Sequence, residues 1–584
     1  MFSPHNIYNK KLIHLSWIIL LYFGIIAFRL IHLQIIQYQR FATWGEKNFL
    51  RYKVIPAQRG NILDCHGVPL AMNQPVTQLI WKGTGNSSLT QQQETAIAKI
   101  NEILCCEPIC MQKIKRAEKF STELVIAESI THEQLSLIAE QCSEILNLTF
   151  NTRFERFYPY DTLASHILGY LGDMHEAISG KMGLEKICEE TLRGNPGILR
   201  QSINSFGSLL DCQEIKQESS GEDIKTSIDL DIQLMLENCM ADQLEGSCII
   251  IEPKTGLIKA LVSKPNFQPT IFSKKLSPQQ WQDMQKQQIF LNRAFNASYP
   301  PASIFKLVTI ATALEEKLMT TQSVFMCNGF HTFKDRKYYC HKHTGHGRIS
   351  AEECLSYSCN IPFFELAQHM HIDTLASYAF EFGLGNKTNV PFCEQHGLIP
   401  TNEWKIAHKG ERWWTGETLS AAIGQSFLLV TPIQVACMIG SIFHGYLVKP
   451  RITLDSELEK KPINISQHTR QFLQNCMKMV ATTGTGRRIM HKIGDLTIYA
   501  KTGTAQTKTR LNSQDPDDMH TTQRLHKEHA WFVSYFYTDD TEPLVLVMLL
   551  EHVGKSSIAV NATHTFLVNY MKWLRKKNVE TIPT

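Results

Sequence analysis

A strong excess of charge of either sign is missing from this 584-residue chain. Its 59 lysines and arginines face 55 aspartates and glutamates, so the formal net charge at pH 7 is only +4. So small an excess gives no reason to expect nucleic acid as a partner. A phosphate-binding loop of the G-x-x-x-x-G-K-[ST] type is also absent, so no nucleotide site of that kind is expected. Hydrophobic residues make up 43% and charged residues 20%, a balance that excludes a disordered or fibrous chain.

The sequence also lacks the cysteine spacing that is typical of small disulfide-rich domains. The sixteen cysteines are scattered along the chain, so they do not predict a disulfide framework, and most are expected to be free, buried thiols. The length itself excludes a single hydrophobic core and predicts two or more domains.

One long apolar run lies near the N-terminus, at residues 12–36. Its strongest part, 15–28, carries no charge, and the whole run reaches the roughly 20 residues that cross a bilayer. Because no A-x-A cleavage site follows, we expect an uncleaved transmembrane anchor in the lipid bilayer after a cytoplasmic tail at 1–11. The alternative is a buried helix of a soluble domain. Basic residues flank the run on both sides and would by count favour the opposite orientation, but long domains translocate regardless of nearby charge.

The rest of the chain divides by pattern into residues 37–225 and 226–584. The first region has helical stretches near 87–118 and 130–147 but no catalytic constellation, so we expect a mixed α+β pedestal or docking domain. The second region has five short apolar runs separated by a long helical insert, followed by a helix near 562–577. We therefore predict an α/β fold with a five-stranded antiparallel sheet flanked by helices, its strands at 248–252, 257–262, 496–500, 531–537 and 544–550.

Ser303 and Lys306 form S-I-F-K after two prolines and before a helical run. Residues three apart share one face of a helix, so the lysine amine is expected to reach the serine hydroxyl. A lysine whose pKa is lowered by burial or by nearby cations can take the proton that makes serine a nucleophile. The helix N-terminus would offer N–H groups to a developing oxyanion. Alone, the tetrapeptide is weak evidence for a site.

Two further motifs follow in the chain. Ser358 and Asn360 belong to S-C-N, where the serine can relay a proton and the asparagine can hold a substrate amide. Lys501 to Thr504 form K-T-G-T at the end of an expected strand. The lysine supplies charge for a substrate carboxylate, and the glycine would let substrate lie close to the strand. S-x-x-K, S-x-N and K-T-G in this order are the motif set of penicillin-binding proteins and class A β-lactamases.

With these motifs in place, the chain resembles a class B penicillin-binding protein along nearly its whole length. R-G-N-I-L-D (59–64), R-F-Y-P-Y (156–160) and G-L-E-K (183–186) are similar to that family's pedestal, and I-G-Q-S-F-L-L-V-T-P-I-Q-V-A (423–436) to its catalytic domain. G-L-E-K-x-x-E-x-x-L-R-G-x-P-G and G-H-G at His346 resemble the elongation type, penicillin-binding protein 2, more than the septal type. Cys359 departs from the aspartate of the motif.

The resemblance implies a peptidoglycan D,D-transpeptidase that needs no cofactor for catalysis and is inhibited by β-lactam antibiotics. Ser303 would attack a stem pentapeptide, with Lys306 as base and Ser358 and Lys501 serving proton transfer and electrostatics. Asn360 with Thr502, Gly503 and Thr504 would hold the substrate. It implies a single-pass inner-membrane protein with its catalytic domain in the periplasm, partnered by a membrane glycan polymerase and elongation-complex proteins.

Four alternatives stay open at this point. A septal transpeptidase of cell division carries the same motifs. A β-lactamase of class A would need a deacylating E-x-x-L-N loop, which the sequence lacks. A β-lactam sensor would carry a signalling region, for which residues 1–11 are too short. A scaffold that has lost catalysis conflicts with the intact motifs.

Cys327, Cys340, His346 and Cys359 lie between the first two motifs or within the second. Three thiolates and one imidazole suit a tetrahedral structural zinc site. Their spacing is not that of a zinc finger, and His341 or His343 could substitute for His346. The alternative is a Cys327–Cys340 disulfide with Cys359 as a small buried residue.

Overall fold

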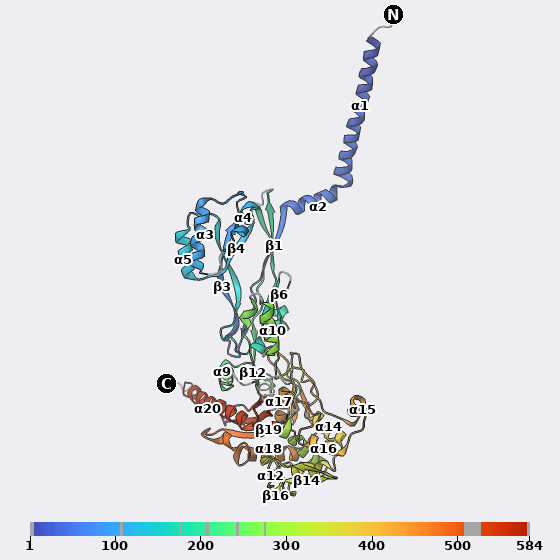
Figure 1. Cartoon of the computed structure of the whole chain (residues 1–584), viewed down its shortest axis with the longest axis vertical. Coiled ribbons are helices and arrows are strands. Elements are labelled where there is room, and N and C mark those ends of the chain that lie inside the picture. Colours follow the sequence, from blue (N-terminus) through green and yellow to red (C-terminus); the bar gives the residue numbers. More distant parts are fainter. Residues whose placement is uncertain are drawn as a thin grey trace, which may run out of the picture. The chain divides into compact units, whose positions relative to one another are not determined.

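The computed structural model describes residues 5–105, 109–174, 177–204, 209–240, 245–273, 276–506 and 527–580. Residues 1–4 of the expected cytoplasmic tail lie outside this range. Contacts between Cα atoms divide the chain into two units (Figure 1). The first unit comprises Met1–Arg59, Asn73–Glu155 and Arg193–Gly221, and the second comprises Gly60–Met72, Arg156–Leu192 and Glu222–Thr584.

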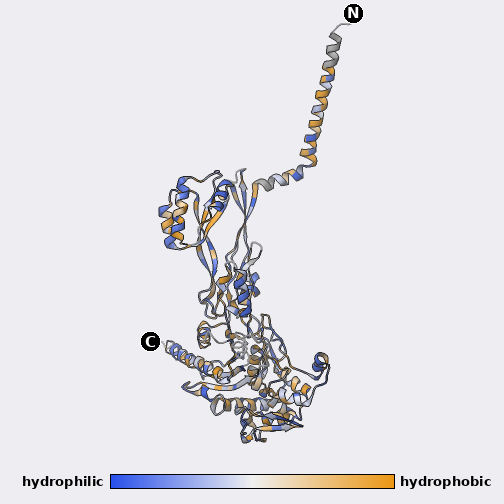
Figure 2. Ribbon diagram, in the orientation of Figure 1, coloured by the Kyte–Doolittle hydropathy of each residue, from blue (hydrophilic) through white to orange (hydrophobic). Residues whose placement is uncertain are grey.

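The apolar run near the N-terminus forms one helical segment. It consists of α1 (His5–Ile31) and a π-helical turn at His32–Ile36, and α2 (Tyr38–Phe49) follows. Among the described residues, Leu12–Ile36 is the one segment long and apolar enough to span a bilayer, and none of it is buried in protein. Figure 2 shows apolar colours recurring along α1. A helix with apolar side chains and no protein around it is what a lipid-solvated anchor requires.

The first unit contains a three-stranded antiparallel sheet and a second sheet covered by helices. The former has the order β1-β8-β9, and in the latter β3 pairs with both β4 and β5. Three helices replace the two expected stretches, because Cys105 ends α3 in the left-handed conformation (φ 49°) and α4 begins six residues later. The elements are β1 (Leu50–Ile55), β3 (Pro69–Lys82), α3 (Gln91–Leu104), α4 (Met111–Lys119), β4 (Glu123–Ile130), α5 (His132–Gln141), β5 (Leu148–Phe157), β8 (Gly197–Ile203) and β9 (Leu209–Lys216).

The second unit is built on the predicted five-stranded sheet, whose order is β12-β11-β21-β20-β19. Every neighbouring pair is antiparallel, so this prediction is confirmed. The last-numbered helix is longer than expected. The strands are β11 (Gly246–Ile251), β12 (Ile258–Lys264), β19 (Thr497–Ala505), β20 (His529–Tyr537) and β21 (Leu544–Leu550), and the helix is α20 (Ser556–Glu580).

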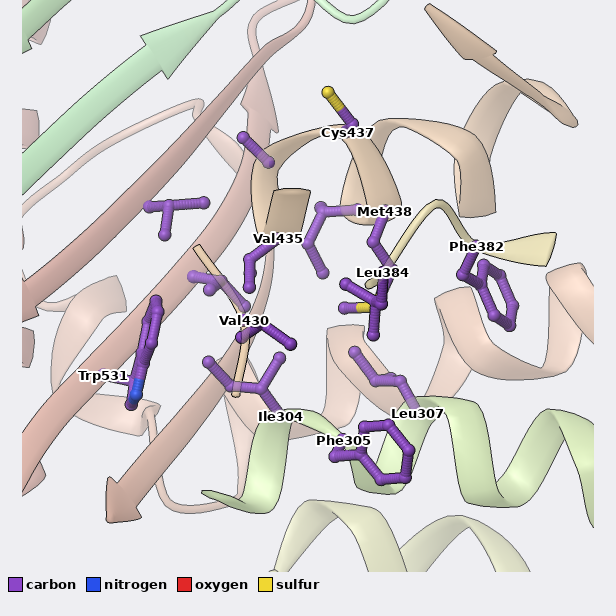
Figure 3. Packing of buried hydrophobic residues seen from close by; sticks show 14 of the residues in the cluster. Ile304, Phe305, Leu307, Phe382, Leu384, Val430, Val435, Cys437, Met438 and Trp531 are labelled. Carbon is purple, nitrogen blue, oxygen red and sulfur yellow. The ribbon is translucent and has the colours of Figure 1, made fainter. Parts of the chain in front are cut away.

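Both faces of this sheet are covered, which explains why its strands read as continuous apolar runs. Successive side chains of a strand point to opposite faces. Phe532 and Met548 therefore join the cluster beneath α9 (Leu230–Cys239) and α20, whereas Trp531 and Leu549 join the cluster on the other face. Figure 3 shows Ile304 and Leu307 in this second cluster with Val430, Val435 and Met438. The arrangement is a helix–sheet–helix sandwich.

The helical insert between β12 and β19 supplies the remaining walls of the second unit. Its helices are α10 (Pro278–Lys286), α11 (Lys306–Glu315), α12 (Ala351–Ser356), α13 (Ile361–Ala367), α14 (Ile372–Glu381), α15 (Asn402–Lys409), α16 (Thr415–Ala422), α17 (Pro432–His444) and α18 (Gln467–Thr482). Short strands form three pairs, namely β13 (Val324–Cys327) with β16 (Gly347–Ser350), β14 (Phe330–Phe333) with β15 (Arg336–Tyr339), and β17 (Tyr446–Val448) with β18 (Lys460–Pro462).

Segments from before residue 226 also belong to the second unit. They contain β2 (Ile62–Leu63), α6 (Ser165–Leu168), β6 (Leu171–Met174), β7 (Ala177–Gly180), α7 (Gly183–Ile187) and α8 (Glu189–Arg193), and β10 (Ile224–Lys225) pairs with β2. Arg156 and Glu185 form a buried ion pair at 2.6 Å, and Arg156 also donates to the carbonyl of Gly60. The three pedestal-like motifs therefore meet at one buried pair.

Candidate active site and cysteine cluster

Ser303 lies in a 3₁₀ turn at Ala302–Ile304 rather than in the α-helix, which begins at Lys306. The preceding Ala302 has a positive φ of 48°, a strained conformation for a residue with a Cβ. Its N–H donates to the carbonyl of Gly424 at 2.9 Å. Ser303 is half-buried between buried neighbours. The turn thus presents the serine from a fixed backbone.

Gly424 is a site residue that the motif search did not single out. Its φ is +77°, and a Cβ added there would lie 1.9 Å from the carbonyl oxygen of Ala302. Only glycine allows the two backbones to approach so closely. The I-G-Q-S-F sequence that resembles the family is therefore the segment that supports the Ser303 turn.

Lys306 is fully buried and bonded to the S-C-N motif. Its Nζ donates to the Ser358 carbonyl at 2.8 Å and to Asn360 Oδ1 at 2.7 Å. It also lies 3.4 Å from Ser358 Oγ and 3.3 Å from the Cys359 carbonyl oxygen. Burial lowers the pKa of Lys306 to about 8, against the opposing effect of nearby thiols.

Lys501 reaches the same hydroxyl from the sheet. Its Nζ lies 3.2 Å from Ser358 Oγ and donates to the carbonyl of Thr502 at 2.9 Å. Burial, and then the neighbouring Lys306, hold the pKa of Lys501 well below its usual range. Two buried amines therefore share one serine hydroxyl, an arrangement that favours a neutral lysine as base.

The K-T-G-T motif lies inside β19 and is paired with β20 along its whole length, from Lys501 opposite Val533 to Thr504 opposite Ala530. The strand thus continues past the end that the sequence suggested. A Cβ on Gly503 would lie 3.1 Å from Trp531 Cβ and 3.3 Å from Ile304 Cγ1. Glycine therefore lets the Ser303 turn pack closely on the strand. Thr502 bonds Thr485 side chain to side chain at 2.7 Å.

The structure brings Lys306, Ser358, Asn360 and Lys501 into one hydrogen-bonded group, and it packs the Ser303 turn against Gly503. Thr504 is half-buried in the same strand. Sequence reasoning missed Gly424 and Tyr339, whose carbonyl accepts the Asn360 amide at 3.2 Å.

The four metal candidates also lie together. Cys327 ends β13, Cys340 follows β15, His346 precedes β16, and Cys359 lies between α12 and α13. Their ligand atoms all lie within 4.8 Å of one another, and the group includes neither His341 nor His343. The cysteines are buried free thiols in this structure.

Three of the distances within this cysteine cluster match the edges of a metal tetrahedron. Cys327 Sγ and Cys340 Sγ lie 3.5 and 3.6 Å from His346 Nδ1, and Cys340 Sγ lies 3.8 Å from Cys359 Sγ. A zinc ion with Zn–S of about 2.3 Å and Zn–N of about 2.1 Å has ligand–ligand edges of about 3.6–3.8 Å. The hydrogen bond from the Cys359 thiol lowers the pKa of Cys340, which favours a thiolate there. The residues therefore fit a zinc ion.

Comparisons with known proteins identify the family to which the chain belongs. Residues 246–567 match the family described as penicillin binding protein transpeptidase domain, and residues 54–226 match the penicillin-binding protein dimerisation domain. The peptidoglycan D,D-transpeptidase MrdA of Acinetobacter baumannii is 28% identical over 98% of this chain and 89% of that protein. MrdA of Escherichia coli is 24% identical over 92% of this chain and 90% of that protein.

Solved structures share the fold. The chain is similar to PBP2 of Helicobacter pylori in its complex with MreC, with a TM-score of 0.73 and 24% identity over 90% of this chain and 99% of that one. A chain in a structure described as "Structural coordination of polymerization and crosslinking by a peptidoglycan synthase complex" gives a TM-score of 0.73 and 26% identity over 96% of this chain and 98% of that one. The transpeptidase match covers more than half of the chain, which therefore belongs to the penicillin-binding protein transpeptidase family as an elongation-type class B member.

Proposed function

We propose that this protein is a serine-type peptidoglycan D,D-transpeptidase that cross-links stem peptides and is acylated by β-lactams at Ser303. The observation that carries the proposal is the Ser358 hydroxyl, which lies 3.4 Å from Lys306 Nζ and 3.2 Å from Lys501 Nζ. Two buried amines with lowered pKa values around one hydroxyl form a proton-transfer group. This group stands directly beside the turn that carries the serine.

In the first half-reaction, Lys306 takes the proton of Ser303 as its Oγ attacks the penultimate D-alanyl carbonyl. The C–O bond to the enzyme forms and the peptide C–N bond breaks. Ser358 gives its proton to the departing D-alanine amine and regains one from Lys306, which carries the proton of Ser303. N–H groups of Ser303 and Thr504 hold the oxyanion. Lys501 attracts the terminal carboxylate.

In the second half-reaction, an amine of a neighbouring stem attacks the acyl-enzyme. The amine loses a proton through Ser358, the new C–N bond forms, and Ser303 regains its proton as it leaves. Asn360 and Thr502 hold the peptide amides. No metal takes part in either step.

We further propose that the enzyme works in cell elongation from the outer side of the inner membrane. The elongation-type family membership supports this role, as does one relative's solved complex with MreC. Residues 12–36 would be the single anchor, 37–225 the pedestal that meets a glycan polymerase and elongation-complex proteins, and 226–584 the catalytic domain in the periplasm. Depletion of the protein should make rod-shaped cells round. Filamentous cells would instead assign it to division.

The catalytic proposal is tested by mapping its acyl-enzyme. The purified full-length protein should be labelled by fluorescent penicillin at Ser303, with the adduct located by mass spectrometry and absent from Ser303→Ala. The adduct should persist for many minutes, because no deacylating E-x-x-L-N loop is present. Rapid turnover of penicillin would favour a β-lactamase, and labelling elsewhere would contradict the mechanism.

We propose secondly that Cys327, Cys340, His346 and Cys359 hold a structural zinc ion. The support is the match of their spacing to a zinc tetrahedron. Four protein ligands leave no position for a reactive water, so the ion would fix the S-C-N loop rather than act on substrate. Elemental analysis of untagged protein should find about one zinc per chain. No zinc, with Cys327 and Cys340 recovered in one disulfide-linked peptide, would contradict the site.

A further inference from the structure

A cleft of about 440 Å³ is lined by residues of β14 and β15 and by the start of α16, and it has no role in the mechanism above. One wall is the turn between β14 and β15, with Phe333 and Arg336. The other is the loop Trp413–Gly416 at the start of α16. The hydroxyl of Tyr338 bridges the walls by donating to the carbonyl of Gly416 at 3.2 Å.

The loop that carries Trp413 and Trp414 is fixed by ion pairs and hydrogen bonds to neighbouring residues. Lys405, whose side chain is 1% exposed, donates to Glu417 Oε2 at 2.7 Å and lies 3.2 Å from Glu411 Oε1. Glu417 in turn accepts the N–H of Trp414 at 3.0 Å. Trp413 is fixed by its indole N–H, which donates to Thr418 Oγ1 at 2.9 Å.

This rigid loop nevertheless leaves the Trp414 side chain 61% exposed. An exposed indole contributes little to the core, whereas a fixed indole gives a ligand a large, flat, pre-organised contact at low entropic cost. An exposed aromatic side chain on a loop that is fixed by a buried lysine is therefore more typical of a binding surface than of a stabilising one.

The opposite wall carries two cations, Lys334 and Arg336. Lys334 and Arg336 are exposed and flank Asp335 at the turn, giving a net charge of +1. Among the described residues, neither cation has a carboxylate within ion-pair distance, and each lies instead near the ring of an aromatic neighbour. The cleft therefore offers an aromatic platform on one side and cations for carboxylates on the other.

One strand, β15, contributes residues to both the cleft and the active site. Tyr338 of β15 forms part of its wall, and the next residue, Tyr339, accepts the Asn360 amide through its carbonyl. A ligand in the cleft thus lies one strand away from the residue that would hold the stem peptide. This adjacency favours the substrate itself, beyond its reacting end, as the occupant.

We propose that this cleft is a subsite for the glycan strand of the substrate. An amino-sugar ring stacks on Trp414, and carboxylates of the attached stem peptides pair with Lys334 and Arg336. The inference rests on the proposed transpeptidase function and adds to it the prediction that stems on a glycan strand bind better than free stems.

The test measures binding to full-length Ser303→Ala protein in detergent, which cannot turn over its substrate. Two probes are compared, soluble uncross-linked glycan strands with pentapeptide stems and the free stem pentapeptide. Strands should bind at least tenfold more tightly than the free peptide. Adding Trp414→Ala, or Lys334→Ala with Arg336→Ala, should weaken strand binding about tenfold, so that the ratio falls towards one. Trp414→Phe should recover most of the binding, because a ring face remains.

Matched controls are Trp281→Ala and Lys387→Ala, which change the same residue types on the second unit outside the cleft. Their strand binding should equal that of the parent, and melting temperatures should show that every variant is folded. Unchanged strand binding in the cleft variants would overturn the subsite. A binding defect of the cleft variants that is seen only when elongation proteins are added would also overturn the subsite. It would identify the cleft as a protein interface. Penicillin labelling of the protein with Ser303 intact tests the transpeptidase proposal separately. The transpeptidase proposal and the subsite proposal can therefore fail independently.

Discussion

Gly424 and Ala302 touch backbone to backbone at the base of the nucleophile turn. Ala302 donates its N–H to the Gly424 carbonyl at 2.9 Å, and a Cβ on Gly424 would lie 1.9 Å from the Ala302 carbonyl oxygen. The contact fixes the position of Ser303 from the turn that follows α16, which is far away in sequence. The geometry of the nucleophile therefore depends on a residue outside the three motifs.

Gly424→Ala should lower the rate of penicillin acylation by about tenfold or more, since small displacements of reacting groups have large effects on rate. It should also destabilise the second unit by about 1–3 kcal/mol through backbone strain. Stopped-flow acylation and thermal melting measure the two effects. Gly410→Ala is the matched control, because its φ is +72° but an added Cβ meets nothing within 4 Å. Equal acylation losses in both variants would show that strain alone is responsible.

Ser358→Ala should reduce acylation by about 10²-fold or more, as expected for loss of a proton-transfer group. Among the described residues, the hydroxyl is the one atom bonded to both Lys306 and Lys501, so its removal separates the two amines. Ser377→Ala, which removes an exposed hydroxyl, should leave the rate unchanged. Acylation rates with fluorescent penicillin provide the measurement. Near-normal acylation of Ser358→Ala would exclude Ser358 from the first half-reaction.

Orientation in the membrane can be read with a reporter fused after Thr584. A reporter that is active only outside the cytoplasm should be active, because the catalytic domain needs access to peptidoglycan. Residues 1–11 should be protected from protease added to spheroplasts. Activity of a cytoplasm-specific reporter at the same position would contradict both the placement and the substrate.

The sequence could predict the features that are determined by residues close together in the chain. The five central strands are readable because both sheet faces are covered, which makes Leu544–Leu550 apolar at every position. The catalytic motifs are readable because their residue types and order are specific. The four cysteine-cluster residues could be grouped because a glycine-bearing, histidine-rich loop has few other reasons to be ordered.

Other features depend on contacts that no local pattern encodes. The approach of Gly424 to Ala302 joins distant segments, and a glycine in I-G-Q-S gives no sign of its partner. Similarly, Arg156 and Glu185 look like pedestal residues by position, yet their buried pair belongs to the unit that contains the catalytic sheet. The strand that carries K-T-G-T was predicted to end too early because lysine and glycine are weak strand formers, and pairing with β20 overrides their preference.

The cysteine cluster should stabilise the second unit and the active site together. Cys340→Ser should lower zinc content, melting temperature and acylation rate in parallel, because the ion would tie Cys340 to the separate loop that carries Cys359 and Asn360. Cys393→Ser changes an exposed cysteine and should alter none of the three. Removal of zinc with a chelator should reproduce the Cys340→Ser phenotype in the wild-type protein. Loss of acylation with unchanged metal content would point to a packing role for the thiol instead.

Stability at acid pH should depend on His166, which is buried in α6 with its Nε2 2.7 Å from the Ile289 carbonyl oxygen. Burial, aided by Arg293 and Lys264, lowers the pKa of His166 from 6.5 to about 4. Between these values the unfolded chain binds a proton that the folded protein does not, so stability falls as pH decreases from 6.5 to 4. The loss reaches about 3 kcal/mol at pH 4, from the size of the shift.

His166→Gln keeps an N–H donor for Ile289 but cannot titrate, so its melting temperature should fall less than that of the wild type between pH 7 and pH 4.5. His132→Gln, at an exposed position, should follow the wild type. Parallel melting curves for His166→Gln and the wild type across this range would show that the buried imidazole does not control acid stability.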